Sequence, residues 1–159
     1  MTDEQHTAKN WLMRLTDYAE KVKAERRTLE MLQTRLYKGV SNYDGFTGRK
    51  DPSTARAARE DALLDFSEQS ARVEKAQKEY LTELEITREV LELIPLRLQA
   101  LAIDRYINGY KWRTLEDLHH YGKSTLLVLN AEILSNVAQI LKAKQTPLKP
   151  NTKPQEATA

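Results

Sequence analysis

Residues 105–127, RYINGYKWRTLEDLHHYGKSTLL, break the pattern of long charged and apolar runs that precedes them. The Asn-Gly pair at 108–109 is a strong helix-ending signal, because glycine readily adopts the left-handed conformation that follows a helix. Directly after it, Trp112, Leu115 and Leu118 fall on one face of a helix of about two turns. The stretch therefore predicts the end of one helix followed by a short second helix.

A turn and a long last helix are predicted next. Gly122 is able to take the left-handed conformation that a tight turn requires. Residues 123–144 then carry an apolar stripe at the spacing of a helix. This stripe consists of Leu126, Leu129, Ile133, Val137 and Ile140. A short helix, a glycine turn and a longer helix follow the order of a helix-turn-helix.

Two long amphipathic helices are predicted earlier in the chain, within residues 1–94. In each of them, the positions of the seam recur at steps of three and four, as in a coiled coil. The first series is Trp11, Leu15, Tyr18, Val22, Leu29, Leu32 and Leu36, with Glu25 as its polar member. The second series is Leu63, Phe66, Ser70, Val73, Gln77, Tyr80, Leu84, Thr87, Leu91 and Ile94.

Residues 38–52 separate these two helices and are rich in residues that form turns. They contain three glycines together with Asn42, Asp44 and Pro52. We therefore expect the helices to fold back on each other. The second helix should begin near Pro52, because proline is tolerated in the first turn of a helix.

The expected fold class is all-α. A long antiparallel, coiled-coil-like hairpin occupies residues 1–94, and a small helix-turn-helix domain occupies residues 95–143. Pro95 marks the boundary, because it supplies no amide hydrogen and restricts the residue before it. Residues 144–159 contain three prolines and almost no apolar residue, which predicts a disordered tail.

Composition and charge narrow the class of protein. The chain has no cysteine, which excludes disulfides and thiolate metal sites, and no apolar run approaches the roughly 18 to 20 residues needed to cross a bilayer. We therefore expect a cytoplasmic protein without membrane contact. Residues 1–95 contain 16 Lys and Arg against 18 Asp and Glu, whereas residues 96–144 contain 7 against 4. Only the C-terminal part is basic, which permits contact with phosphate.

No catalytic, metal or cofactor site is predicted. Acidic pairs such as Glu83 with Glu85 lie among Lys and Arg at the spacing of a solvated helical face. His119 and His120 are adjacent, so their side chains point about 100° apart on a helix, and no third ligand recurs at a useful spacing. We expect neither enzyme activity nor a bound metal or cofactor.

The helix-turn-helix region resembles a known family. The run from Arg105 to Gly109, followed by Trp112, Leu115 and Tyr121, resembles the region-four-like domain of sigma factors. It is more closely similar to small phage-encoded transcriptional regulators of Gram-positive bacteria, in which a helical hairpin precedes this domain. The resemblance implies a regulator of late or packaging genes that binds promoter DNA.

The resemblance also implies roles for individual residues. The scaffold residues that would hold the two helices at their angle are Tyr106, Gly109, Trp112, Leu115 and Tyr121. The two tyrosines are expected in the core. Reading of DNA would begin at the first turn of the last helix, whose free amides can meet a phosphate. The candidate DNA-binding residues are Lys111, Arg113, Lys123, Ser124, Thr125 and Val128.

The last helix departs from the family in its charge. Val128 and Glu132 stand where the relatives carry arginine and lysine, so two expected cations are missing. A second apolar stripe also runs along this helix, and it consists of Leu127, Val128, Ala131, Leu134 and Ala138. Helices that are apolar on nearly all sides are buried. We therefore expect the second stripe to pack on the hairpin or on another subunit.

Two functions remain open at this point. The first is a DNA-binding transcriptional regulator of phage or prophage genes, whose helix-turn-helix contacts promoter DNA and whose hairpin forms a homo-oligomer. The second is a helical protein-interaction module, in which the helix-turn-helix contacts RNA polymerase or another phage factor and no longer reads DNA. A basic and open last helix would favour the first function, and an apolar and paired one the second.

Overall fold

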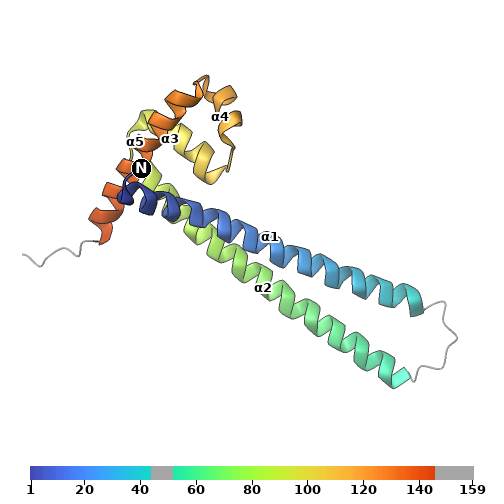
Figure 1. Ribbon diagram of the computed structural model, residues 1–159. Helices are drawn as coiled ribbons and strands as arrows, with labels where there is room; N and C mark the ends of the chain where they lie inside the picture. Colours follow the sequence, from blue (N-terminus) through green and yellow to red (C-terminus); the bar gives the residue numbers. More distant parts are fainter. Residues whose placement is uncertain (44–51, 146–159) are drawn as a thin grey trace, which may run out of the picture. The chain divides into compact units, whose positions relative to one another are not determined.

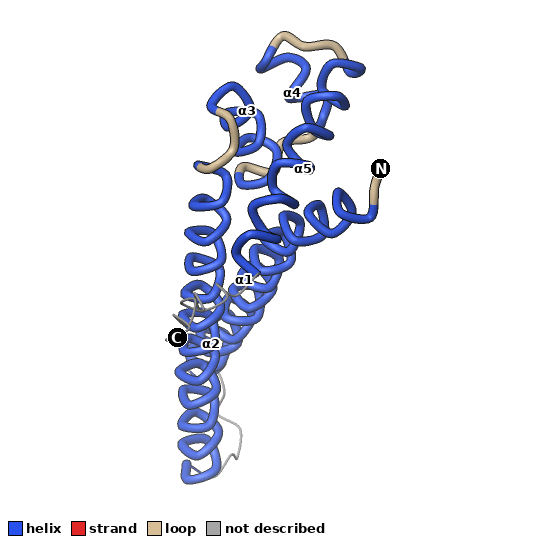
Figure 2. Tube along the Cα trace, turned by 90° about the vertical axis from the view of Figure 1, so that its left-hand side faces the viewer, coloured by secondary structure: helices blue, strands red, loops and turns tan. Residues whose placement is uncertain are grey.

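The computed structural model describes residues 1–43 and 52–145, and the described chain is all-α (Figure 1). The elements in chain order are α1 (Asp3–Tyr43), α2 (Pro52–Glu92), α3 (Leu96–Ala102), the π-helical segment η1 (Ile103–Ile107), α4 (Trp112–His119) and α5 (Lys123–Gln145). No strand occurs among these residues (Figure 2). The predicted fold class is therefore confirmed: two long antiparallel helices are followed by shorter ones.

The chain divides into two compact units. The hairpin unit comprises Arg14–Glu85. The head unit joins Met1–Met13 to the chain from Ile86 onward. Each long helix therefore contributes one end to the head unit and the rest of its length to the hairpin unit.

The hairpin unit is held by the seam between α1 and α2. On the α1 side Leu15 and Val22 are buried, and the later leucines of the predicted series are half-buried. This bears out the periodicity of the first series, because its residues face the partner helix. Ion pairs flank the seam, with Arg14 2.7 Å from Glu83 and Lys21 3.3 Å from Glu79.

The second predicted series, which follows α2, agrees with the structure only in part, since Val73, Thr87, Leu91 and Ile94 are buried as predicted. Leu63 is 51% exposed, so its assignment to the seam is wrong. The buried positions include Gln69 and Ala76, whereas the expected Ser70 and Gln77 are only half-buried. Gln69 faces α1, where it donates a hydrogen bond to the Glu25 backbone carbonyl at 3.0 Å and another to the Glu25 carboxylate.

The ends of the hairpin helices differ slightly from the prediction. Helix α1 continues to Tyr43, although residues 38–43 were assigned to the loop. One glycine inside a helix costs only about 1 kcal/mol relative to alanine, so Gly39 does not end the helix. Helix α2 begins at Pro52, as predicted. Residues 44–51 of the predicted loop and residues 146–159 of the predicted tail lie outside the described residues.

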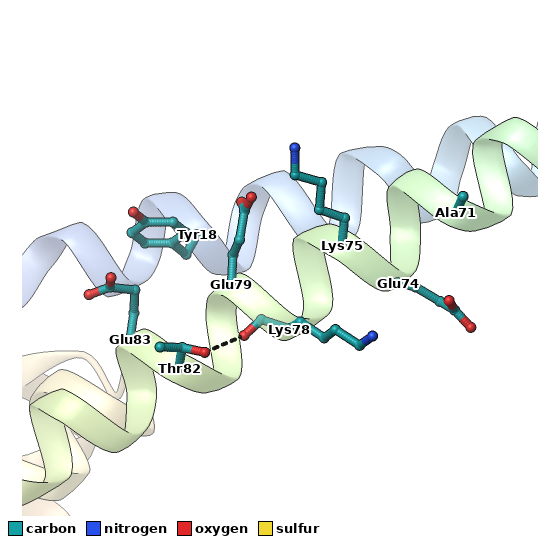
Figure 3. A pocket seen from close by; sticks show the side chains of 8 residues that line it. All are labelled: Tyr18, Ala71, Glu74, Lys75, Lys78, Glu79, Thr82 and Glu83. Carbon is teal, nitrogen blue, oxygen red and sulfur yellow. Dashed lines mark hydrogen bonds between the residues drawn. The ribbon is translucent and has the colours of Figure 1, made fainter.

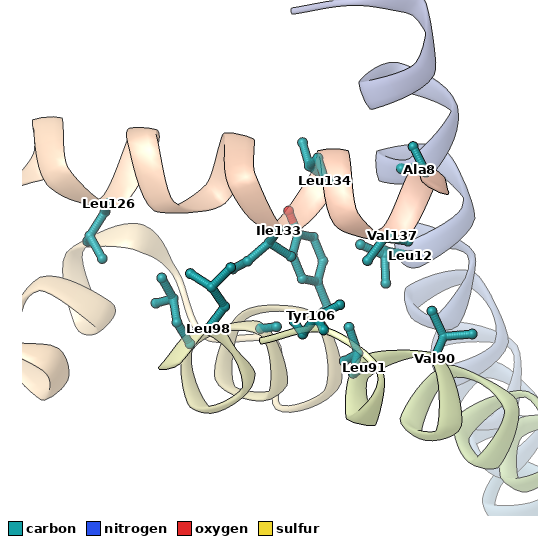
Figure 4. Packing of buried hydrophobic residues seen from close by; sticks show 14 of the residues in the cluster. Ala8, Leu12, Val90, Leu91, Leu98, Tyr106, Leu126, Ile133, Leu134 and Val137 are labelled. Atoms are coloured by element: carbon teal, nitrogen blue, oxygen red, sulfur yellow. The ribbon is translucent and has the colours of Figure 1, made fainter. Parts of the chain in front are cut away.

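The core of the head unit is assembled from both ends of the chain. Residues of α1 and α2 pack with the four C-terminal elements (Figure 4). The fully buried large side chains are Leu12, Leu91, Leu98, Leu115, Leu126, Ile133, Leu134, Val90, Val137 and Thr87. Burying a leucine or isoleucine contributes about 1.5–3 kcal/mol relative to exposure. This core therefore fixes the elements that carry the candidate site.

One turn precedes α4 and another follows it, and the second differs from the prediction. Gly109 has a φ of 74°, which confirms the left-handed conformation expected after the preceding helix. At the other turn His120, with a φ of 56°, is left-handed, and Gly122 is not. The reason is that α4 ends at His119, so the position directly after the helix is His120. Leu118 of α4 is exposed, so its predicted place on the packed face is wrong.

Helix α5 is long and apolar enough to cross a membrane when length and composition alone are considered. Core helices of soluble proteins meet the same two conditions, and six residues of α5 are buried in the head unit. The evidence for a membrane span is therefore weak, and the expected lack of membrane contact stays a prediction.

Candidate nucleic-acid interface

Asp104 of η1 contacts both the loop before α4 and the end of α4. Its Oδ1 accepts a hydrogen bond from Asn108 Nδ2 at 2.9 Å, and its Oδ2 lies 2.7 Å from His119 Nε2. Its backbone carbonyl also accepts the amide of Tyr110 at 3.0 Å. One carboxylate residue therefore holds both the loop before α4 and the last residue of α4.

Arg105 fixes the start of α4. Its guanidinium lies 4.5 Å from the centroid of the Trp112 ring and donates a hydrogen bond to the Tyr110 carbonyl at 2.9 Å. A cation over an indole ring is attracted by the negative face of the ring. Lys111 and Arg113, which flank Trp112 in the chain, are therefore presented from an anchored turn.

Tyr106 anchors the middle of α5. The Tyr106 hydroxyl donates a hydrogen bond to Asn130 Oδ1, and both side chains are buried. Burial raises the pKa of Tyr106 to about 12, and this outweighs the neighbouring Arg105 charge and the Asn130 hydrogen bond, which lower it. The hydroxyl is thus a neutral donor, and the predicted place of Tyr106 in the core is confirmed.

All six candidate DNA-binding residues are exposed. Lys111 precedes α4 and Arg113 lies in its first turn, while Lys123, Ser124 and Thr125 form the first turn of α5. Val128 follows one turn later and is 60% exposed. The structure thus places these residues at the beginnings of two helices that pack on each other.

The cations of this surface have no ion-pair partner among the described residues. This holds for Lys111, Arg113 and Lys123. Lys123 occupies the first turn of α5, where a positive charge opposes the helix dipole and is unfavourable by a few tenths to about 1 kcal/mol. An anion bound at this end of α5 would offset that cost.

The acidic residues nearby are partly neutralised. Glu132, which stands where the resembled family carries a cation, forms an ion pair with Arg97 of α3. Asp117 is exposed and lies four residues after Arg113, so the two share one face of α4. Glu116 and Asp117 form no ion pair among the described residues, so they offset part of the positive charge that Lys111, Arg113 and Lys123 give this surface.

The second apolar stripe of α5 is divided between two environments. Leu134 and Ala138 are buried with Ala8 and Leu12 of α1, which confirms for this half the expected packing on the beginning of the hairpin helices. Leu127 and Val128 are 53% and 60% exposed, so their expected packing on the hairpin is wrong, and packing on another subunit stays a prediction. The beginning of α1 meets α5 at Ala131 through Gln5 and in the core around Leu134 and Ala138.

Several residues of this region were not identified from the sequence. Tyr121 was expected in the core, but it lies in the turn after α4 and is exposed. The roles of Asp104, Arg105 and Arg97 were missed because each depends on a partner in another element. Asn130 could have been recognised, since it is a polar residue within the buried stripe of α5 and therefore requires a hydrogen-bond partner.

The described residues of the hairpin unit form an open groove between α1 and α2. This groove is lined by Tyr18, Ala71, Glu74, Lys75, Lys78, Glu79, Thr82 and Glu83 (Figure 3). Acidic and basic side chains alternate along it, as expected for the solvated face of a helix. Among the described residues, no group of three or more His, Asp or Glu side chains could hold a metal ion.

Comparison with known proteins gives no match: no protein-family model matches the chain, and no curated protein or solved structure does so either. The resemblance to a region-four-like domain therefore rests on the residues quoted above and stays a prediction.

Proposed function

We propose that the chain binds duplex DNA through the beginnings of α4 and α5 and acts as a transcriptional regulator. The observation that carries this proposal is the set of exposed cations Lys111, Arg113 and Lys123, which have no ion-pair partner among the described residues. Phosphate contacts by Lys and Arg supply most of the sequence-independent affinity of DNA-binding proteins. One of these cations, Lys123, lies in the first turn of α5, where the free amides of the helix end also favour a phosphate.

The rest of the proposal follows the resemblance. A short helix, a turn and a longer helix occur in the expected order, and the buried residues Tyr106 and Leu115 support their packing. The resemblance favours a regulator of phage or prophage genes, with the hairpin forming a homo-oligomer that places two helix-turn-helix units on two half-sites. Light scattering on the full chain, with and without duplex, measures the stoichiometry that this requires.

A second function is favoured by the exposed apolar residues of the same surface. Leu118, Leu127 and Val128 are all more than half exposed. Exposed apolar residues that form a contiguous patch often contribute to protein interfaces. The alternative is therefore a protein-interaction module that docks RNA polymerase or another phage factor through this surface.

DNA binding is tested by selecting duplexes from a random-sequence pool with the full chain, followed by electrophoretic mobility shift. We expect binding with a shallow salt dependence, corresponding to about three phosphates per protomer, because only three cations are available. The Arg113→Glu/Lys123→Glu double variant should lose binding. Asp117→Asn should strengthen it a few-fold, because it removes an acidic group from the face that carries Arg113.

A matched control makes the same change of charge in the hairpin unit. Arg26 and Arg27 are exposed residues of α1, and the Arg26→Glu/Arg27→Glu variant should keep the affinity of the parent chain. Equal losses in both double variants would show that only net charge matters. Failure of the parent to enrich any duplex at low salt would reject the proposal in favour of the protein-interaction module.

A further inference from the structure

We infer that Val128 recognises the C5-methyl group of a thymine in the major groove. This inference rests on the proposed DNA-binding function and specifies how that site reads a base. It concerns the exposed side of the first two turns of α5, where Ser124, Thr125 and Val128 lie together.

The helical register places these three residues on one side of α5. Val128 lies four residues after Ser124 and three after Thr125, so it sits between them, one turn further along the helix. The buried residues Leu126, Asn130 and Ile133 hold the opposite side in the core. The side that carries Val128 is therefore the outward side of an anchored helix.

The chemistry of this side excludes the usual contacts to purines. Arginine or lysine is required for a bidentate contact with guanine, and asparagine or glutamine for one with adenine. None of these residue types occurs among Ser124, Thr125 and Val128. The serine and threonine hydroxyls can bond to more than one base, so they do not by themselves select one. Thr125 carries a methyl group beside its hydroxyl, whereas Val128 offers apolar atoms alone. Valine is restricted to apolar contact, and the apolar group that DNA presents in the major groove is the thymine methyl.

The surrounding charges favour DNA as the occupant of this surface. Lys123 lies directly before Ser124 at the start of the helix, where phosphate is attracted by both the ammonium group and the helix dipole. Glu132, one turn after Val128, is paired with Arg97, so its carboxylate does not stand alone against the phosphates. Charge complementarity therefore directs the apolar contact of Val128 toward a polyanion.

Leu127 provides an internal contrast on the same helix. It is 53% exposed, compared with 60% for Val128, but it points about 100° away, toward the flank that continues into the buried Leu134 and Ala138. We therefore expect Val128 and not Leu127 to meet a base when the first turn of α5 enters the groove.

The test compares thymine with deoxyuridine in the duplex selected by the full chain. Deoxyuridine keeps every hydrogen-bonding group of thymine and lacks only the methyl group. Each thymine is replaced in turn, and affinities are measured by titration. At one position of each half-site the parent should bind roughly fourfold more weakly, the value expected for one buried methyl group. The Val128→Ala variant should lose most of this difference between thymine and deoxyuridine at that position, because two of the three side-chain carbons are removed.

Two further measurements complete the design. Leu127→Ala is the matched control and should keep the parent's preference for thymine. Replacing a cytosine by 5-methylcytosine at the sensitive position, after a T-to-C change, should recover part of the affinity, because it restores the same methyl group.

The possible outcomes are distinct. Equal affinity for thymine and deoxyuridine at every position, with DNA binding intact, would overturn the inference and leave the proposed function standing. The same would follow if Val128→Ala kept the parent's preference, because another residue would then read the methyl group. Lack of binding to any duplex would reject the proposed function and the inference together.

Discussion

The two halves of helix α5 have similar apolar residues and opposite environments. Leu127 and Val128 in the first half are 53% and 60% exposed, whereas Leu134 and Ala138 in the second half are 0% and 6% exposed. All but Val128 lie on one flank of the helix, away from the main buried stripe. An apolar stripe on a helix is therefore buried only where another segment of the chain packs against it.

The covering segment is the beginning of α1. Gln5 donates hydrogen bonds to Ser135 Oγ at 2.9 Å and to the Ala131 carbonyl at 3.3 Å, and Lys142 forms an ion pair with Glu4. These contacts all lie at or beyond Ala131. The first half of α5 therefore keeps its apolar and polar side chains available for a ligand.

The largest expected effect comes from truncating matched leucines in the two halves. Leu134→Ala should lower the free energy of unfolding by about 2–5 kcal/mol, because it leaves a cavity in a packed core. Leu127→Ala should lower it by less than about 1 kcal/mol, because its side chain is already largely in water. Chemical denaturation of both variants, followed by circular dichroism, measures the difference.

If Leu127→Ala lowered the free energy of unfolding as much as Leu134→Ala, the proposed difference between the two halves would be contradicted. A loss that grows with protein concentration would then identify a second copy of the chain as the cover of the first half. A loss independent of concentration would place Leu127 inside the fold.

A smaller effect is expected at Tyr106, which is bonded to Asn130 at the junction of the two halves. Tyr106→Phe should lower the free energy of unfolding by about 1–3 kcal/mol at neutral pH, because the buried Asn130 carbonyl loses its donor. The variant keeps the ring, so the loss reports the hydroxyl alone. Urea unfolding at pH 7 measures it.

The same residue predicts a dependence on alkaline pH. The pKa of Tyr106 is about 12 in the folded chain and about 10 when unfolded, so only the unfolded state releases the proton between these values. The parent should therefore lose stability as pH rises from about 10 to about 12, and Tyr106→Phe should lack this component. Parallel alkaline slopes for the two proteins would contradict the burial of the hydroxyl.

The smallest effect is expected at the contact between α1 and α5. Gln5→Ala should lower the free energy of unfolding by about 1 kcal/mol, because it removes hydrogen bonds that connect the two helices. Gln139→Ala changes an exposed glutamine of α5 and serves as the control. If the two variants are equally stable, the beginning of α1 is not held by Gln5.

The predictions from the sequence succeeded where a helix has one clear apolar face. The stripe through Leu126, Ile133 and Val137 is buried as expected, and so is the α1 seam at Leu15 and Val22. They failed where two registers were nearly equivalent, since the α2 seam uses Gln69 and Ala76 in place of Ser70 and Gln77. Gln69 is bonded to Glu25 across the seam, and a polar pair of this kind leaves no periodic apolar signal in the sequence.

The candidate site was predictable in its positions but not in its supports. The resemblance to region-four-like domains implied the cations and small polar residues at the helix starts, and all of them lie at the surface. The anchoring by Asp104 and Arg105, which bind the loop and both ends of α4, could not be predicted, because it depends on a π-helical segment that directs these side chains toward α4.

Local sequence signals are sufficient to predict an all-α chain and the residues that stand at the starts of α4 and α5. These features depend on local periodicity and on the conformations of glycine and proline, which act within a few residues. The packing of Met1–Met13 with the C-terminal helices in one core, and the burial of Leu134 but not of Leu127, are visible only in the folded chain. The physical reason is that burial depends on contacts between segments more than a hundred residues apart, and helical periodicity does not specify which segments meet.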